Sequence, residues 1–161
     1  MSRLHCTQRV LKRFRLVPST SPKSESGRLG HWYANLLNVG RTRWVLCLSE
    51  RALLPVILPA KNAYFPATLP HEVAKVLMEL GIDESRAVEE TRSMASLEID
   101  RTRNRQVLGV MNDFSVQASL WLGDGLSPVR AALRVARTRS GPLDYDSPES
   151  VARLIFGSES S

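Results

Sequence analysis

The sequence is poor in cysteine, with only Cys6 and Cys47 among its 161 residues. Two cysteines cannot form the disulfide framework of a small secreted scaffold, and both lie in apolar surroundings typical of buried, reduced thiols. No apolar run approaches the roughly 20 residues that a membrane-spanning helix needs. Residues 1–6 also lack the apolar stretch and cleavage site of a signal peptide. We therefore expect a cytoplasmic protein without a membrane segment.

Familiar catalytic signatures are absent as well. The chain contains no glycine-rich phosphate loop, no His-Glu-x-x-His and no Gly-x-Ser-x-Gly. Four residues that can ligate zinc, namely His5, Cys6, His31 and Cys47, fall on predicted strands, but none of them forms the short paired spacings of zinc sites. The sequence therefore predicts neither a cofactor nor a bound metal.

Acidic residues are scarce in the first part of the chain, which makes its charge one-sided. Residues 1–65 hold eleven Lys or Arg but only Glu25 and Glu50, whereas residues 66–161 hold eleven Lys or Arg and fourteen Asp or Glu. Such a basic segment favours an acidic partner, either nucleic acid or an acidic protein. The leading hypothesis is a non-catalytic binding module, with phosphate or carboxylate contacts from Arg9, Lys12, Arg13, Arg41 and Arg43.

The order of predicted elements indicates an α+β fold in one domain spanning residues 1–161. Strand-like apolar runs come first and amphipathic helices follow, so we expect a mostly antiparallel sheet from the N-terminal half, packed on one face against the C-terminal helices. Residues near 18–30 are rich in Ser, Pro and Gly, which predicts a mobile loop, and the C-terminus is expected to fray near 157–161. The predicted strands are 3–6, 31–37, 43–48, 53–58 and 97–99, and the predicted helices are 8–15, 71–80, 83–94, 104–122, 128–137 and a last one from about 147.

One predicted helix also bears a polar stripe. At helical spacing, Arg105, Gly109 and Asn112 share one face, with Asp113 beside it. The stripe leaves two interpretations open. In one, the protein is an enzyme in which Arg105 grips a phosphate or carboxylate, Asn112 hydrogen-bonds it and Asp113 acts as a base or metal ligand, with His5 or His31 from the sheet as a further member of the site. In the other, Arg105 pairs with Asp113 or another carboxylate and anchors the helix; we expect a buried pair of this kind.

Several short segments spread along the chain form a recognisable pattern. They are Leu4-His5-Cys6-Thr7-Gln8, Trp32-Tyr33-Ala34-Asn35-Leu36, Leu54-Pro55-Val56, Asn104-Arg105-Gln106-Val107-Leu108-Gly109, Met111-Asn112-Asp113-Phe114, Pro142-Leu143-Asp144-Tyr145 and Ser147-Pro148. Together these segments resemble an uncharacterised bacterial family of domains of unknown function. The resemblance covers nearly the whole chain and implies a bacterial, cytoplasmic and self-contained unit, sometimes associated with plasmid or transposon passenger domains. It supplies no catalytic residues.

Overall fold

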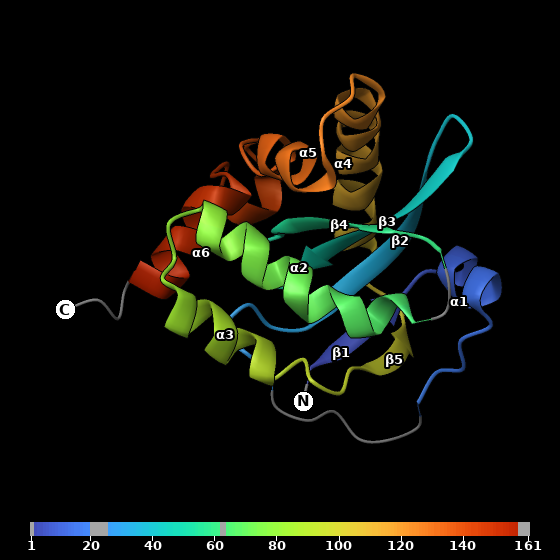
Figure 1. Cartoon of the computed structure of the whole chain (residues 1–161), viewed down its shortest axis with the longest axis horizontal. Coiled ribbons are helices and arrows are strands. Elements are labelled where there is room, and N and C mark those ends of the chain that lie inside the picture. Colours follow the sequence, from blue (N-terminus) through green and yellow to red (C-terminus); the bar gives the residue numbers. More distant parts are fainter. Residues whose placement is uncertain (1, 20–25, 62–63, 158–161) are drawn as a thin grey trace.

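The computed structural model describes residues 2–19, 26–61 and 64–157 (Figure 1). The remaining residues lie outside this part, including 20–25 of the predicted loop and 158–161 of the predicted frayed end. A five-stranded sheet is combined with six α-helices, so the predicted α+β class is confirmed. In the described ranges, no helix is long and apolar enough to cross a membrane.

The sheet is mixed, which corrects the expectation of a mostly antiparallel one. Its order is β4-β3-β2-β1-β5, with the bounds β1 Arg3–Cys6, β2 Trp32–Val39, β3 Thr42–Ser49, β4 Pro55–Pro59 and β5 Glu98–Arg101. The hairpin β2–β3 and the pair β3–β4 are antiparallel, whereas β1 runs parallel to both β2 and β5. Parallel neighbours need connections of a dozen or more residues, and the chain provides them before β2 and before β5.

Helices cover both faces of this sheet, not one face as the order of elements suggested (Figure 1). Consecutive residues of the middle strands point to opposite faces of the sheet, and both faces are buried. Trp32 and Ala34 belong to the core on one face, whereas Tyr33 and Leu37 belong to the core on the other. A single covered face would have left every second strand residue exposed. One face carries α1 Gln8–Phe14, α2 Phe65–Glu79, α3 Glu84–Arg92 and α6 Pro148–Gly157, and the other carries α4 Arg105–Gly123 and α5 Pro128–Val135.

The helix ends follow local capping chemistry. Asn104 accepts a hydrogen bond from the backbone N–H of Val107 at 3.1 Å and starts α4, and Ser127 caps α5 in the same way. Helix α1 ends where Arg15 adopts a left-handed conformation with φ of 52°. Helix α2 starts six residues before the predicted position 71, because Pro66 is accommodated in its first turn and Pro70 lies inside the helix.

Both cysteines are buried and unpaired, as the sequence predicted. Burial raises the pKa of the Cys6 thiol to about 12, with a smaller contribution from the Asp100 carboxylate. Burial also raises the pKa of Cys47. Because the thiolate is the reactive form, a buried thiol with a raised pKa is a poor nucleophile.

Glu90 ties the described end of the predicted loop to α3. Its carboxylate accepts backbone N–H bonds from Arg28 at 2.8 Å and Leu29 at 3.2 Å, although only 4% of the residue is exposed. Burial raises the pKa of Glu90, and the two N–H donors oppose that shift. A Cβ on Gly27 would collide with this carboxylate, which explains a glycine at that position. The segment that was expected to be mobile is therefore anchored where it is described.

We expect Glu90→Ala to lower the free energy of unfolding by about 1–3 kcal/mol, because it leaves the backbone N–H groups of Arg28 and Leu29 without their acceptor. Urea denaturation followed by circular dichroism measures the change. Glu89→Ala, an exposed neighbour on the same helix, is the control and should shift stability by less than about 0.5 kcal/mol. Equal effects of the two changes would contradict an anchoring role for Glu90.

Candidate functional site: a basic edge of the sheet

Helix α1 presents a basic surface at the carboxyl end of the parallel strands. Its apolar residues Val10, Leu11 and Phe14 are buried against the sheet, as the helical spacing predicted. The remaining face exposes Arg9, Lys12 and Arg13, followed by Arg15 at the C-cap. No acidic residue occurs in this helix. Its positive charge is therefore not neutralised within α1.

A second basic segment emerges beside α1. Strand β5 pairs with β1 so that Cys6 lies opposite Arg101, and the N–H of Thr102 bonds the Cys6 carbonyl at 3.0 Å. The chain then continues through Arg103 into Arg105 at the start of α4, and all three arginines are exposed. Since parallel strands end at the same edge, residues about ninety positions apart in sequence become neighbours.

The β2–β3 hairpin supplies the third segment. It extends past the end of β1, because β1 stops opposite Ala34 while β2 continues to Val39. Arg41 and Arg43 are exposed in and after the turn, and the turn itself uses Gly40 at φ of 58°. Figure 1 places this tip and α1 at the same end of the molecule.

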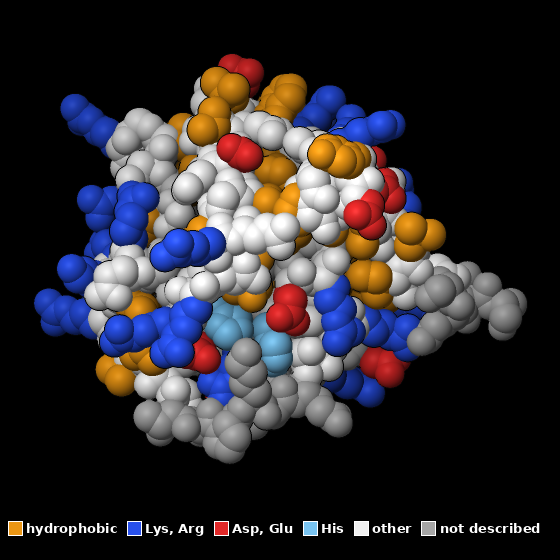
Figure 2. All heavy atoms as spheres, turned by 180° about the vertical axis from the view of Figure 1, so that it is seen from behind, with side chains coloured by type: hydrophobic (Ala, Val, Ile, Leu, Met, Phe, Trp, Pro, Cys, Tyr) orange, Lys and Arg blue, Asp and Glu red, His pale blue; other side chains and the backbone are white. Residues whose placement is uncertain are grey.

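Together these side chains form what we term the basic edge. In the view from behind, Lys and Arg side chains gather along the side where α1 and the hairpin tip lie (Figure 2). Several like charges on one side of a protein raise the local electrostatic potential, which attracts polyanions, and at 0.1 M salt each charge acts over a Debye length of about 10 Å. The basic edge consists of Arg9, Lys12, Arg13, Arg15, Arg41, Arg43, Arg101, Arg103 and Arg105.

Sequence reasoning assigned five of these nine residues to a contact surface and singled out Arg105 as a candidate anchor for a phosphate or carboxylate, but it did not single out the other three. Arg15 was placed in the predicted helix without a role, and Arg101 and Arg103 were not assigned to any contact surface. The signal for them is an arginine at every second position after a short strand, at residues 101, 103 and 105. That signal gains meaning only when β5 is known to lie beside β1.

The polar stripe on α4 does not form a closed site. Arg105, Asn112 and Asp113 are all exposed, as is Gly109 between them. Arg105 and Asp113 are eight residues apart, or about 12 Å along the helix axis, so they do not pair with each other. The expectation of a buried ion pair at Asp113 was therefore wrong. Catalytic groups need to reach one reacting atom, and these three are spread along an open surface.

Two rows of polar side chains cross strands β5, β1 and β2 on the α4 face of the sheet. The first row places Glu98 and His31 on either side of Arg3, whose guanidinium contacts Glu98 Oε2 at 3.2 Å and Asp100 Oδ2 at 3.5 Å. Arg3 is 1% exposed. A buried guanidinium of this kind requires its carboxylates, so the row fixes the pairing of β5 with β1.

The second row places His5 between Asp100 and Tyr33. The His5 ring stacks on Tyr33 with centroids 4.9 Å apart, and its Nδ1 lies 3.4 Å from the Arg101 carbonyl and 4.0 Å from Asp100 Oδ2. Burial raises the pKa of Tyr33, opposed by a hydrogen bond from Asn104, and the Glu50 carboxylate adds to the rise. Through the bond between Tyr33 and Asn104, this row links the sheet to the start of α4, next to the arginines at 101–105.

The histidines and cysteines once considered as zinc ligands are divided between the two faces of the sheet. Cys6 and Cys47 belong to the core under α1 and α2. His5 and His31 lie in contact on the other face, with ring centroids 5.9 Å apart, and Nδ1 of His31 accepts the backbone N–H of Arg3 at 2.9 Å. Among the described residues, no group of three or more potential metal ligands converges.

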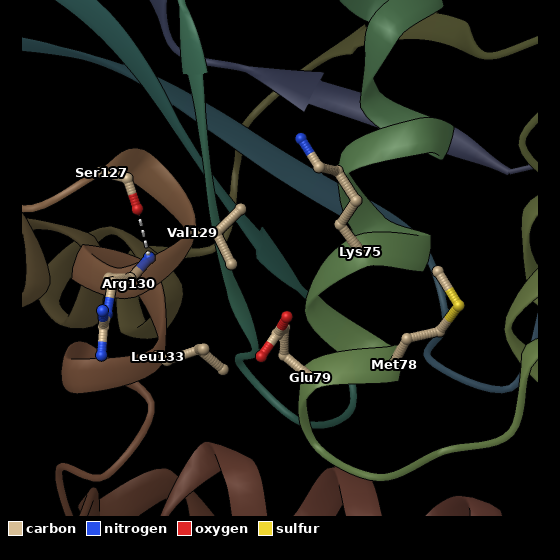
Figure 3. A pocket seen from close by; sticks show the side chains of 7 residues that line it. All are labelled: Lys75, Met78, Glu79, Ser127, Val129, Arg130 and Leu133. Carbon is tan, nitrogen blue, oxygen red and sulfur yellow. Dashed lines mark hydrogen bonds between the residues drawn. The ribbon is translucent and has the colours of Figure 1, made fainter.

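A hollow with a volume of about 530 Å³ lies between α2 and α5 (Figure 3). Two of its polar side chains are already engaged, since Ser127 accepts the Arg130 backbone N–H and Lys75 contacts Glu72 at 3.3 Å. Figure 3 shows Lys75 and Ser127 toward one end of the groove and Glu79 toward the other. Side chains so arranged do not converge on a ligand.

Comparison with known proteins gives a family but no activity. The model of a family described as a domain of unknown function (DUF6933) matches residues 3–151. No curated protein matches the chain, and no solved structure does. The matched range includes both polar rows and every residue of the basic edge.

Proposed function

We propose that this chain, which belongs to the DUF6933 family, is a binding module that holds the phosphate backbone of a nucleic acid on its basic edge. One observation supports the proposal most directly. Three segments far apart in sequence each expose arginines without any acidic residue, and the pairing of β1 with β2 and β5 brings the segments that follow β1 and β5 side by side. Guanidinium groups bind phosphate oxygens in a bidentate manner, and phosphate contacts supply most of the affinity in non-specific binding.

The shape of the edge suits a backbone ligand better than a small anion. Its side chains are exposed on a helix, a hairpin tip and a connecting segment, with no enclosing wall around them. An extended polyanion can contact several such groups at once, whereas a single phosphate would reach one or two. The predicted bacterial, cytoplasmic setting and link to mobile DNA remain predictions, and a nucleic-acid ligand is compatible with them.

We expect the protein to bind fluorescently labelled DNA or RNA of about 20 nucleotides with strong salt dependence. If six or more basic side chains contact phosphates, affinity should fall by about 10³-fold or more between 50 and 200 mM salt. Fluorescence anisotropy at a series of salt concentrations measures both the dissociation constant and the slope. Absence of binding to single strands and duplexes at 50 mM salt would refute the proposal. Capture of an acidic protein from a lysate by the wild-type chain would then identify the alternative partner.

A further inference from the structure

A small cavity opens beside the arginines of the basic edge. Its volume is about 120 Å³. Glu50 and Arg51, directly after β3, form one wall, and Asn104 and Gln106 at the start of α4 form another. Apolar side chains of α4 and of the 3-10 turn at 141–143 complete it, among them Val107, Val110 and Leu143.

The size of this cavity restricts its ligand. Drug-sized ligands occupy pockets of roughly 300–1,000 Å³. The present cavity is smaller than these and therefore suits one small ring, comparable with a pyrimidine base. The mixture of apolar walls and a few polar groups suits a flat ring with a hydrogen-bonding edge.

The polar groups of the cavity are held in place from behind. Glu50 Oε1 accepts the His31 backbone N–H at 3.2 Å, which fixes the carboxylate. Asn104 Oδ1 accepts from Val107, and its side chain also bonds the hydroxyl of the buried Tyr33. Arg51 uses one of its N–H groups on the Arg28 carbonyl at 3.2 Å, and a guanidinium has five. An ionised carboxylate only accepts hydrogen bonds, so the ligand must present a donor to Glu50.

The position of the cavity links it to the proposed phosphate contacts. Arg103 and Arg105 flank Asn104 in sequence and are exposed. A nucleic-acid strand on the basic edge would therefore pass the mouth of the cavity. Bases of a single strand are unstacked easily and can be read on their hydrogen-bonding edges, whereas a paired base would first have to leave its duplex.

We propose that this cavity binds one unstacked cytosine of a single-stranded nucleic acid, with the Glu50 carboxylate accepting a hydrogen bond from the base's N4 amino group. The inference rests on the proposed function and adds a base preference to it. Cytosine offers an amino donor at this position, whereas thymine and uracil offer the acceptor O4, which a carboxylate repels. Arg51 and Gln106 lie within the same cavity and can meet the acceptors of the ring.

The test compares labelled oligo(dC) and oligo(dT) of equal length by fluorescence anisotropy at pH 7.5 and fixed salt. Wild-type protein should bind oligo(dC) about fivefold or more tightly than oligo(dT), as one hydrogen bond to a charged acceptor permits. Glu50→Gln, which keeps the shape and can both donate and accept, should reduce this ratio to within about twofold. The ratio is the readout because loss of a negative charge near the basic edge raises both affinities alike.

Glu89→Gln removes the same charge at an exposed position on α3 and should leave the ratio unchanged. Unchanged melting of both variants confirms that they are folded. Equal binding of oligo(dC) and oligo(dT) by the wild type would overturn the cytosine site while leaving the phosphate-binding proposal intact. A preference that persists in Glu50→Gln would overturn the role of Glu50. Failure to bind either strand at low salt would instead defeat the proposed function itself.

Discussion

Replacing Arg3 with Met should lower the free energy of unfolding by about 3 kcal/mol. The substitution keeps most of the side-chain volume but leaves Glu98 and Asp100 without the guanidinium between them. Removing one partner of a buried ion pair typically costs 3–5 kcal/mol. The two carboxylates are each 25% exposed, so water compensates for part of the loss and the lower end of this range is expected. Urea denaturation of both proteins measures the difference.

Two further variants make this test specific. Asp113→Asn alters an exposed carboxylate on α4 and should change stability by no more than about 0.5 kcal/mol. Adding Glu98→Gln and Asp100→Asn to Arg3→Met removes the uncompensated charges and should recover part of the lost stability. A cost below 1 kcal/mol for Arg3→Met alone would show that the first polar row does not hold β5 in place.

Removing five charges from the basic edge should weaken nucleic-acid binding on the order of 10³-fold at 100 mM salt. Each lost phosphate contact also lowers the slope of log affinity against log salt by somewhat less than one. Because all five positions are exposed, we expect the variant to remain folded, and melting curves check this directly. The variant combines Arg9→Gln, Lys12→Gln, Arg13→Gln, Arg41→Gln and Arg43→Gln.

A control variant with the same net charge separates local contacts from overall charge. It carries five Gln substitutions at exposed basic residues outside the three segments of the basic edge, on α2, α3, α5 and the segment after α5. We expect it to bind within about threefold of the wild type and to keep the wild-type salt slope. If both variants weaken binding equally, long-range attraction by net charge explains the affinity and the basic edge is not a site. The control positions are Lys75, Arg92, Arg130, Arg137 and Arg139.

Elements fixed by local pattern could be predicted from the sequence. The stripe of Val73, Val76, Leu77 and Leu80 identifies α2, and the glycine-containing connection after Val39 identifies the hairpin. These signals depend on residues close together in the chain. Local pattern also predicts one part of the candidate site, because the basic face of α1 follows from the spacing of residues within that helix.

Features that depend on distant pairing could not be predicted in this way. The position of β1 between β2 and β5 is set by contacts with residues about 30 and 95 positions away, and a four-residue strand gives no sign of its partner. The second covered face did leave a signal, since Leu46-Cys47-Leu48 and Val56-Ile57-Leu58 are apolar without alternation, which is typical of strands buried on both sides. The arginines at 101–105 joined the site only through the β1–β5 pairing.

The central place of β1 also constrains the order in which the protein can acquire its structure during synthesis. Residues 3–6 leave the ribosome well before one of their two partner strands, which ends at Arg101. At about 5–20 residues per second, β1 waits for roughly 5–20 seconds before β5 is available. Its edge stays open for that time, and such edges invite wrong pairing. Arg3 and His5 place polar groups on β1 while it lacks this partner. These groups disfavour association of β1 with apolar segments until Glu98 and Asp100 have been synthesised.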